Sequence, residues 1–244
     1  MLLERFLWAK ADEVARLRQQ ERKGALPVPF SGQRGDFIAA LQRREAGVPL
    51  TVIAEFKQAS PSRGPICRSL TVEEAARQYV AAGAGALSIL TERRFFAGEL
   101  DFLGRAAACC PGTPLLRKDF IFDPLQVRAT AATPAAALLL IVALTPDAAL
   151  LRRLREQAES LGMQAVVEVC GKKDLVLARE SGARIIQVNA RDLDTLRVDR
   201  QACLELARQC PPERGEIWIA ASGMDRREHL EEAARAGFFA ALVG

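Results

Sequence analysis

The sequence predicts an α/β protein, a closed (β/α)8 barrel of the TIM-barrel type that carries a helical extension at its N-terminus. Eight short apolar runs recur at intervals of roughly 27 residues, with amphipathic helical segments between them. The runs are rich in Val, Ile, Leu and Ala and lack in–out alternation, which is typical of parallel strands covered on both faces. They are residues 52–56, 86–90, 114–116, 137–141, 165–167, 185–188, 217–220 and 240–243.

The first 48 residues differ from this repeat and predict a helical extension. Their apolar side chains recur at helical spacing among charged ones, until Gly24 and Pro27 break the pattern. A second short helix is expected over residues 36–44, before a turn at Gly47. We therefore divide the chain into an extension, residues 1–48, and a barrel, residues 49–244.

Helix-start and helix-end signals agree with the βα repeat. Two capping boxes are expected, Thr71 with Glu74 and Asp225 with Glu228, and two caps stand directly before a proline, at Asp123 and Thr145. Glycines at helix ends precede four of the apolar runs, at Gly83, Gly162, Gly182 and Gly237. An open doubly wound sheet is the main competing fold, but no G-x-G-x-x-G motif follows the first strand.

Composition excludes several classes of protein. The six cysteines (67, 109, 110, 170, 203 and 210) include no C-x-x-C pair, and His229 is the single histidine, so neither a zinc site nor a disulfide framework is expected. The longest apolar run, residues 135–144, is about half the roughly 20 residues of a membrane span. A net charge of +4 without a Lys/Arg block does not favour nucleic-acid binding. We read no signal peptide and expect a cytoplasmic protein.

Polar residues stand where the apolar runs stop, and in a barrel of this kind those positions share one rim. Glu168 is the most informative, because a carboxylate among valines is costly unless it is paired. Each residue also has a structural interpretation: Glu55 with Lys57 as an internal ion pair, Lys118 as one of three solvated charges in Arg117–Asp119, the others as turn residues. The full set is Glu55, Lys57, Ser60, Lys118, Glu168, Asn189, Arg191, Ser222 and Gly223.

Three other candidates have weaker support. Phe95 and Phe96 could form an apolar wall for an aromatic substrate or simply fill the core. Cys170 could reach the rim, but no histidine is available there as a base. His229 is expected on the surface of the last helix.

The stretches AEFKQASPSRG, LTERRFFAGELDFL, LLRKDF, VVEV, VNARDLDT and AASGM, in this order, resemble indole-3-glycerol phosphate synthase. This family converts 1-(o-carboxyphenylamino)-1-deoxyribulose 5-phosphate into indole-3-glycerol phosphate, carbon dioxide and water in tryptophan biosynthesis, without a metal or organic cofactor. The resemblance implies a general acid at Lys118, a proton-transfer carboxylate at Glu168, and supporting catalytic residues at Glu55, Lys57 and Asn189. It implies substrate contacts at Ser60, Phe96, Arg191, Ser222, Gly223 and Gly244.

The sequence departs from the family pattern at two places. Ala221 stands where the family usually has a glutamate, and the sequence stops at Gly244, where the family continues with a last helix. Two alternatives stay open: another phosphosugar barrel such as phosphoribosylanthranilate isomerase, and a barrel that binds phosphorylated ligands, or serves as a scaffold, without turnover. Only the second is supported by these two departures. The expected ligand is a phosphorylated small molecule, and the expectation leaves room for a homo-oligomer or a tryptophan-pathway partner enzyme.

Overall fold

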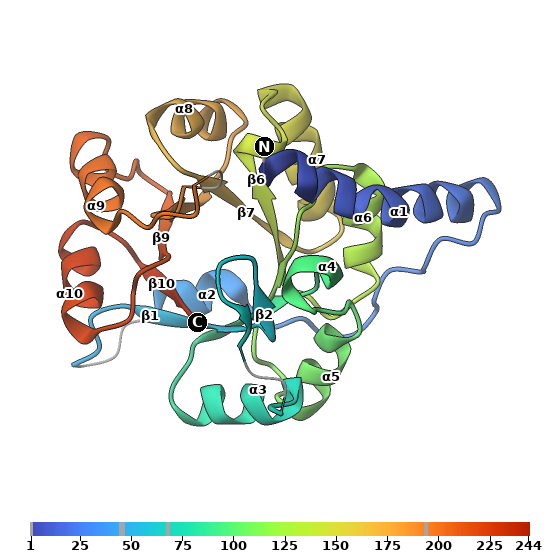
Figure 1. Cartoon of the computed structure of the whole chain (residues 1–244), viewed down its shortest axis with the longest axis horizontal. Helices are drawn as coiled ribbons and strands as arrows, with labels where there is room; N and C mark the ends of the chain where they lie inside the picture. Colours follow the sequence, from blue (N-terminus) through green and yellow to red (C-terminus); the bar gives the residue numbers. More distant parts are fainter. Residues whose placement is uncertain (1, 44–46, 67–68, 193–194) are drawn as a thin grey trace.

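The computed structural model describes residues 2–43, 47–66, 69–192 and 195–244, and it confirms the predicted barrel (Figure 1). Eight parallel strands close in the order β1-β10-β9-β8-β7-β6-β5-β4. Each predicted run coincides with a strand to within two residues at either end. The barrel strands are β1 (Thr51–Phe56), β4 (Ala86–Leu90), β5 (Leu115–Lys118), β6 (Ala137–Ile141), β7 (Gln164–Val169), β8 (Ile185–Asn189), β9 (Ile217–Ala221) and β10 (Ala240–Val243).

Helices surround the barrel, and a short hairpin follows β1. The hairpin pairs β2 (Ala59–Ser60) with β3 (Gly64–Pro65) in antiparallel fashion. In the extension lie α1 (Leu2–Arg22) and α2 (Phe37–Gln42). The other helices are α3 (Val72–Ala81), α4 (Arg93–Phe96), α5 (Phe102–Cys109), α6 (Pro124–Ala131), the 3-10 turn η1 (Val142–Leu144), α7 (Ala148–Ser160), α8 (Lys172–Glu180), α9 (Arg200–Gln209) and α10 (Arg227–Arg235).

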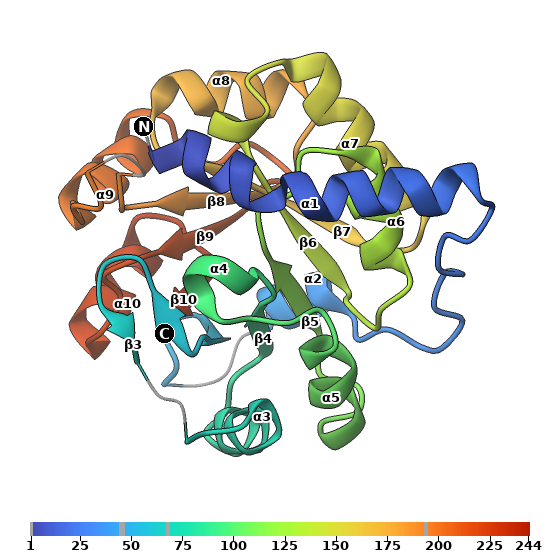
Figure 2. The same cartoon turned by 45° about the vertical axis from the view of Figure 1, so that its right-hand side comes forward.

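The extension packs against the barrel instead of standing apart from it. Figure 2 shows α1 crossing in front of β6 and β7. Phe6 of α1 stacks on Phe120, which follows β5, with ring centroids 4.0 Å apart. Between the two helices, Arg34 donates to backbone carbonyls of residues 131, 133 and 135, where α6 turns into β6. The predicted second helix is shorter than expected, and Arg44 lies outside the described residues.

Two of the four predicted helix caps are confirmed. Thr71 and Glu74 form a reciprocal capping box at α3, and Asp123 forms one with Gln126 at α6. The capping box at Asp225 is wrong, because α10 begins two residues later and the Asp225 carboxylate lies 2.9 Å from His229 Nδ1 instead.

The predicted cap at Thr145 is also wrong. Its hydroxyl donates back to the Ile141 carbonyl, and Asp147 caps α7 by accepting from the Ala149 N–H. The four helix-ending glycines all have positive φ, between 77° and 95°, as the predicted left-handed conformation requires.

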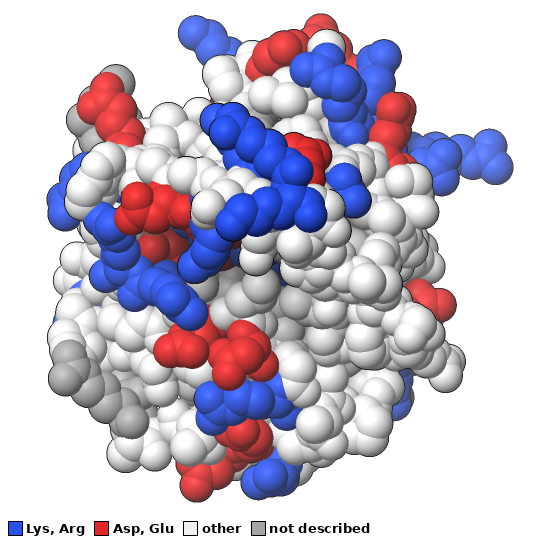
Figure 3. Space-filling model, turned by 90° about the vertical axis from the view of Figure 1, so that its right-hand side faces the viewer, with Lys and Arg blue, Asp and Glu red and all other residues white. Residues whose placement is uncertain are grey.

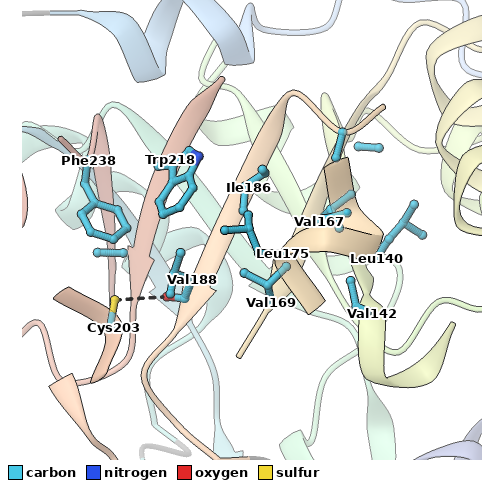
Figure 4. Packing of buried hydrophobic residues seen from close by; sticks show 14 of the residues in the cluster. Leu140, Val142, Val167, Val169, Leu175, Ile186, Val188, Cys203, Trp218 and Phe238 are labelled. Atoms are coloured by element: carbon cyan, nitrogen blue, oxygen red, sulfur yellow. Dashed lines mark hydrogen bonds between the residues drawn. The ribbon is translucent and has the colours of Figure 1, made fainter. Parts of the chain in front are cut away.

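The strands are buried on both faces, which explains their continuous apolar runs. One set of side chains fills the barrel interior, including Leu139, Val166 and Ile219. The alternate set points outward under the helices (Figure 4), where Trp218 packs edge-on against Phe238 at 5.8 Å between ring centroids. This period of two fixes which strand residues can reach the barrel mouth.

Charged groups are interleaved on the surface. On the face drawn in Figure 3, Lys and Arg lie among Asp and Glu and form no single block. Within the described residues, no helix is long and apolar enough to cross a membrane, and no three His, Cys, Asp or Glu side chains are grouped as metal ligands would be. The described cysteines are free, while Cys67 lies outside the described residues.

Candidate active site at the carboxyl ends of the strands

The strand ends bring Lys118 and Glu168 together. Lys118 is the last residue of β5 and Glu168 lies near the end of β7, with β6 between them. The Lys118 Nζ is 3.7 Å from the Glu168 Oε2. The lysine side chain is 19% exposed and the carboxylate 1%, so the amine faces the rim while the carboxylate lies beneath it. The two groups thus form an ion pair across β6 at the carboxyl ends of the strands.

Amides hold the Glu168 carboxylate in place. Asn189 Nδ2 donates to Oε1 at 3.1 Å, and Gln187 Nε2 donates to Oε2 at 2.5 Å. Asn189 in turn accepts hydrogen bonds at its Oδ1 from the Ser222 hydroxyl, at 2.9 Å, and from the Arg191 N–H, at 3.0 Å. One hydrogen-bonded chain therefore links the ends of β7, β8 and β9.

A second ion pair lies at the end of β1. Lys57 Nζ is 2.9 Å from Glu55 Oε1, and the Ser88 hydroxyl of β4 is 3.5 Å from the other carboxylate oxygen. Gly244 packs so closely here that a Cβ on it would lie 2.6 Å from the Glu55 Cβ and 3.1 Å from Lys57 Nζ. The end of β10 thus needs a residue without a side chain.

The turn after β9 has an unusual backbone. Ser222 has φ 68° and Gly223 has φ 73°, so two successive residues lie in the left-handed region. This conformation is costly for a serine, and such strain persists where the surrounding structure holds it, often at ligand sites. The Ser222 hydrogen bond to Asn189 is one of the contacts that hold it here.

The remaining predicted contact residues lie around this group. Ser60, in the β2–β3 hairpin, accepts from the Arg63 N–H, and the Arg191 guanidinium donates to the Leu196 carbonyl at 2.9 Å. Phe96 is half-buried on α4, with its ring centroid 6.1 Å from that of Phe120. Phe96 packs against Phe120 and is also partly exposed. Its position therefore fits both interpretations, a core residue and an apolar wall for an aromatic substrate.

The surroundings of two minor candidates, Cys170 and His229, differ from those that a catalytic role requires. Cys170 is exposed, but desolvation by the surrounding protein and the charge of Glu168 raise the pKa of its thiol to about 12, which opposes thiolate chemistry. The His229 side chain is 19% exposed, more covered than the surface position predicted for it.

The charges flanking Lys118 are not solvated, contrary to one interpretation of the Arg117–Asp119 sequence. Arg117 is 1% exposed, and its guanidinium lies 2.7 Å from the Asp119 carboxylate. Lys10 of α1 also reaches Asp119, at 2.9 Å. Burial alone would raise the pKa of Asp119, but the charges of Arg117 and Lys10 outweigh it and lower that pKa from 3.8 to about 2.

This buried ionic group was missed from the sequence. It extends from Asp119 to Glu13 of α1, which accepts from Arg117 at 3.1 Å, and to the Thr91 hydroxyl, which donates to Asp119. Strand periodicity was the available signal, because a rim-facing Lys118 places its two neighbours on the opposite, helix-covered side.

Comparison with known proteins gives a single family. The family model described as indole-3-glycerol phosphate synthase matches residues 3–244. Proteins named indole-3-glycerol phosphate synthase from Chloroherpeton thalassium and Mycobacteroides abscessus are 42% and 44% identical to the chain. The first match covers 99% of this chain and 92% of the relative, and the second covers 90% and 76%.

Solved structures with low sequence identity share the fold. A 3-hexulose-6-phosphate synthase has a TM-score of 0.62 at 16% identity, covering 80% of this chain and 90% of the other. The N-acetylmannosamine-6-phosphate 2-epimerase from Clostridium perfringens has a TM-score of 0.63 at 11% identity, covering 88% and 92%. With the family match over nearly its whole length, the chain belongs to the indole-3-glycerol phosphate synthase family.

Proposed function

We propose that this protein is a carbon–carbon lyase that converts 1-(o-carboxyphenylamino)-1-deoxyribulose 5-phosphate into indole-3-glycerol phosphate, carbon dioxide and water. The observation that carries the proposal is the pairing of Lys118 with the buried Glu168 at the barrel mouth, 3.7 Å apart. Family membership supports the same reaction. The proposal includes a cytoplasmic location, in which the described free thiols stay reduced.

Lys118 is proposed as the general acid of ring closure. An ammonium group at the rim donates a proton to the ribulose carbonyl oxygen while the aromatic carbon attacks the carbonyl carbon. Loss of the ring carboxylate as carbon dioxide then restores aromaticity. Glu168 is proposed to transfer a proton in the dehydration that follows, and its amide contacts with Asn189 and Gln187 keep it oriented for that step.

The second ion pair is proposed to act on the substrate's carboxylate end. Lys57 supplies a positive charge that can hold an anion, and Glu55, 2.9 Å away, keeps the amine oriented. Because position 221 is an alanine, it adds no carboxylate to the two already named, Glu55 and Glu168. The Ala221 methyl is buried in the interior cluster, where it contributes packing and no charge.

The phosphate and the aromatic ring are proposed to bind to separate groups of residues. Backbone N–H groups of the left-handed turn at Ser222 and Gly223 suit a phosphate. Gly244, which lies against Glu55 and Lys57, is proposed to contact the substrate as well. Phe96 is proposed to contact the aromatic ring. Ser60 and Arg191 are proposed to contact the substrate from the loops above.

The test is a fluorescence assay for indole-3-glycerol phosphate, run with the purified chain and the carboxyphenylamino substrate. We expect product to accumulate with saturation kinetics. Turnover of N-(5-phosphoribosyl)anthranilate without indole formation would favour the isomerase alternative. Thermal stabilisation by the carboxyphenylamino substrate without product would favour a non-catalytic binding barrel.

A further inference from the structure

Gln187 is a polar residue in the middle of an otherwise apolar strand. It lies on β8 and is fully buried, and its side chain points to the barrel interior, on the same face as Ile185 and Asn189. Its neighbour in register on β9 is Ile219, which is also fully buried. In the sequence Gln187 stands inside an apolar run, residues 185–188, and no role was predicted for it.

Within the part of the chain that the structure describes, only one of the two polar atoms of the Gln187 amide makes a hydrogen bond. Its Nε2 donates to the Glu168 Oε2, while Asn189 serves the other oxygen, so each carboxylate oxygen has an amide donor. The Gln187 Oε1 is buried and has no hydrogen-bond partner among the described residues. A buried acceptor without a partner lowers stability, so an apolar side chain of similar size would suit this position better for folding alone.

The geometry points to Gln187 as a positioning residue for proton transfer by Glu168, an inference that rests on the proposed function. The two amide donors fix the plane of the carboxylate, so that Oε2 stays directed at Lys118. When Glu168 takes up a proton, a half-turn of the Gln187 amide brings its unpartnered oxygen to the new O–H. In the proposed dehydration Glu168 takes this proton from the ring being formed and delivers it to the departing hydroxyl, which leaves as water, so Gln187 itself gains and loses no proton.

The test compares Gln187→Met with the control Ile219→Met, an interior substitution on the neighbouring strand that removes no hydrogen bond. We expect Gln187→Met to lower kcat about tenfold, with KM changed less than twofold and Tm no lower than that of the wild type. Ile219→Met should leave kcat within twofold. Gln187→Leu is a second variant should the first fold poorly.

The pH profile of kcat gives a readout that packing alone does not move. Loss of a donor disfavours the ionised carboxylate, so the acidic limb of the Gln187→Met profile should shift to higher pH. Among the described residues, Lys118 from β5 pairs with Glu168, and Cys170 beyond β7 is close enough to feel its charge; both stay in place in this variant. An unshifted acidic limb contradicts the inference.

Two results separate this inference from the proposed function. No indole product from the wild type refutes the proposed function, and the inference falls with it. Product from the wild type together with a kcat within twofold in Gln187→Met refutes the inference alone. In a Glu168→Gln background the substitution should change single-turnover rates less than twofold, and a further tenfold loss there would show that Gln187 does not act through Glu168.

Discussion

Replacing Lys10 with methionine tests whether the N-terminal helix is fastened to the strand that carries the proposed general acid. The Lys10 side chain is 4% exposed, and its amine lies 2.9 Å from the Asp119 carboxylate, directly after Lys118 in the chain. Methionine keeps much of the side-chain volume but removes the charge. Asp119 keeps Arg117 as a partner. Glu13, three residues after Lys10 on α1, loses its contact with the Lys10 amine.

The expected loss in the free energy of unfolding is about 3 kcal/mol, because breaking a buried ion pair by removing one partner typically costs about 3–5 kcal/mol. For a chain of this size the loss corresponds to a fall in Tm of roughly 6–12 °C. Urea denaturation followed by circular dichroism measures it, with Arg208→Met as the control. Arg208 pairs with Glu205 on the surface, at 60% and 52% exposure, and should matter by about 0.5 kcal/mol at most.

A loss of less than about 1 kcal/mol for Lys10→Met would refute this reasoning, because it would mean that the buried contact has the weight of a surface pair. The kcat of the variant should fall as well, since Lys118 sits between Arg117 and Asp119 and loses a constraint on its backbone.

The other predictions concern binding, acid stability and helix capping. Arg191→Ala should raise KM more than it lowers kcat in steady-state assays of indole product; the reverse pattern would make Arg191 a catalytic group. The Asp119 pKa, about 2 when folded against 3.8 as the ordinary value, stabilises the fold by about 2 kcal/mol above pH 4, and this contribution is lost as the pH falls through 2. Asp119→Asn should therefore flatten the pH dependence of Tm between pH 4 and pH 2, and an unchanged slope would contradict the assignment. Thr71→Ala should cost about 1 kcal/mol by chemical denaturation through loss of the α3 cap, and no measurable change would show that the cap is not needed.

The barrel could be predicted because its strands are buried on both sides. Runs such as residues 137–141 contain no polar residue and leave little doubt about their extent. The predicted helix starts were less reliable, because the side chain of an expected cap can bond to another partner instead of the helix. Asp225 lies beside His229, and Thr145 bonds back to the preceding strand, so neither caps the helix that follows.

The site residues at the rim of the barrel could be predicted, but the residues that contact them below the rim could not. Lys118 and Asn189 end their strands and Glu168 lies one residue before the end of its own, so the fold alone brings them together. The partners that lie below the rim were not predicted. Lys10 and Asp119 are 109 positions apart, and a lysine in an amphipathic helix normally reads as a surface residue. Gln187 was hidden within an apolar run, where a single amide does not break the pattern.

The most direct test of the account is single-turnover formation of indole-3-glycerol phosphate by the wild type and by Lys118→Ala at saturating substrate. We expect product from the wild type and a rate constant at least about 100-fold lower in the variant, the usual contribution of a positioned general acid. Substrate affinity should change far less, because the rest of the rim remains. A variant rate within a few-fold of the wild type would contradict the central claim that Lys118, paired with Glu168, performs the chemistry.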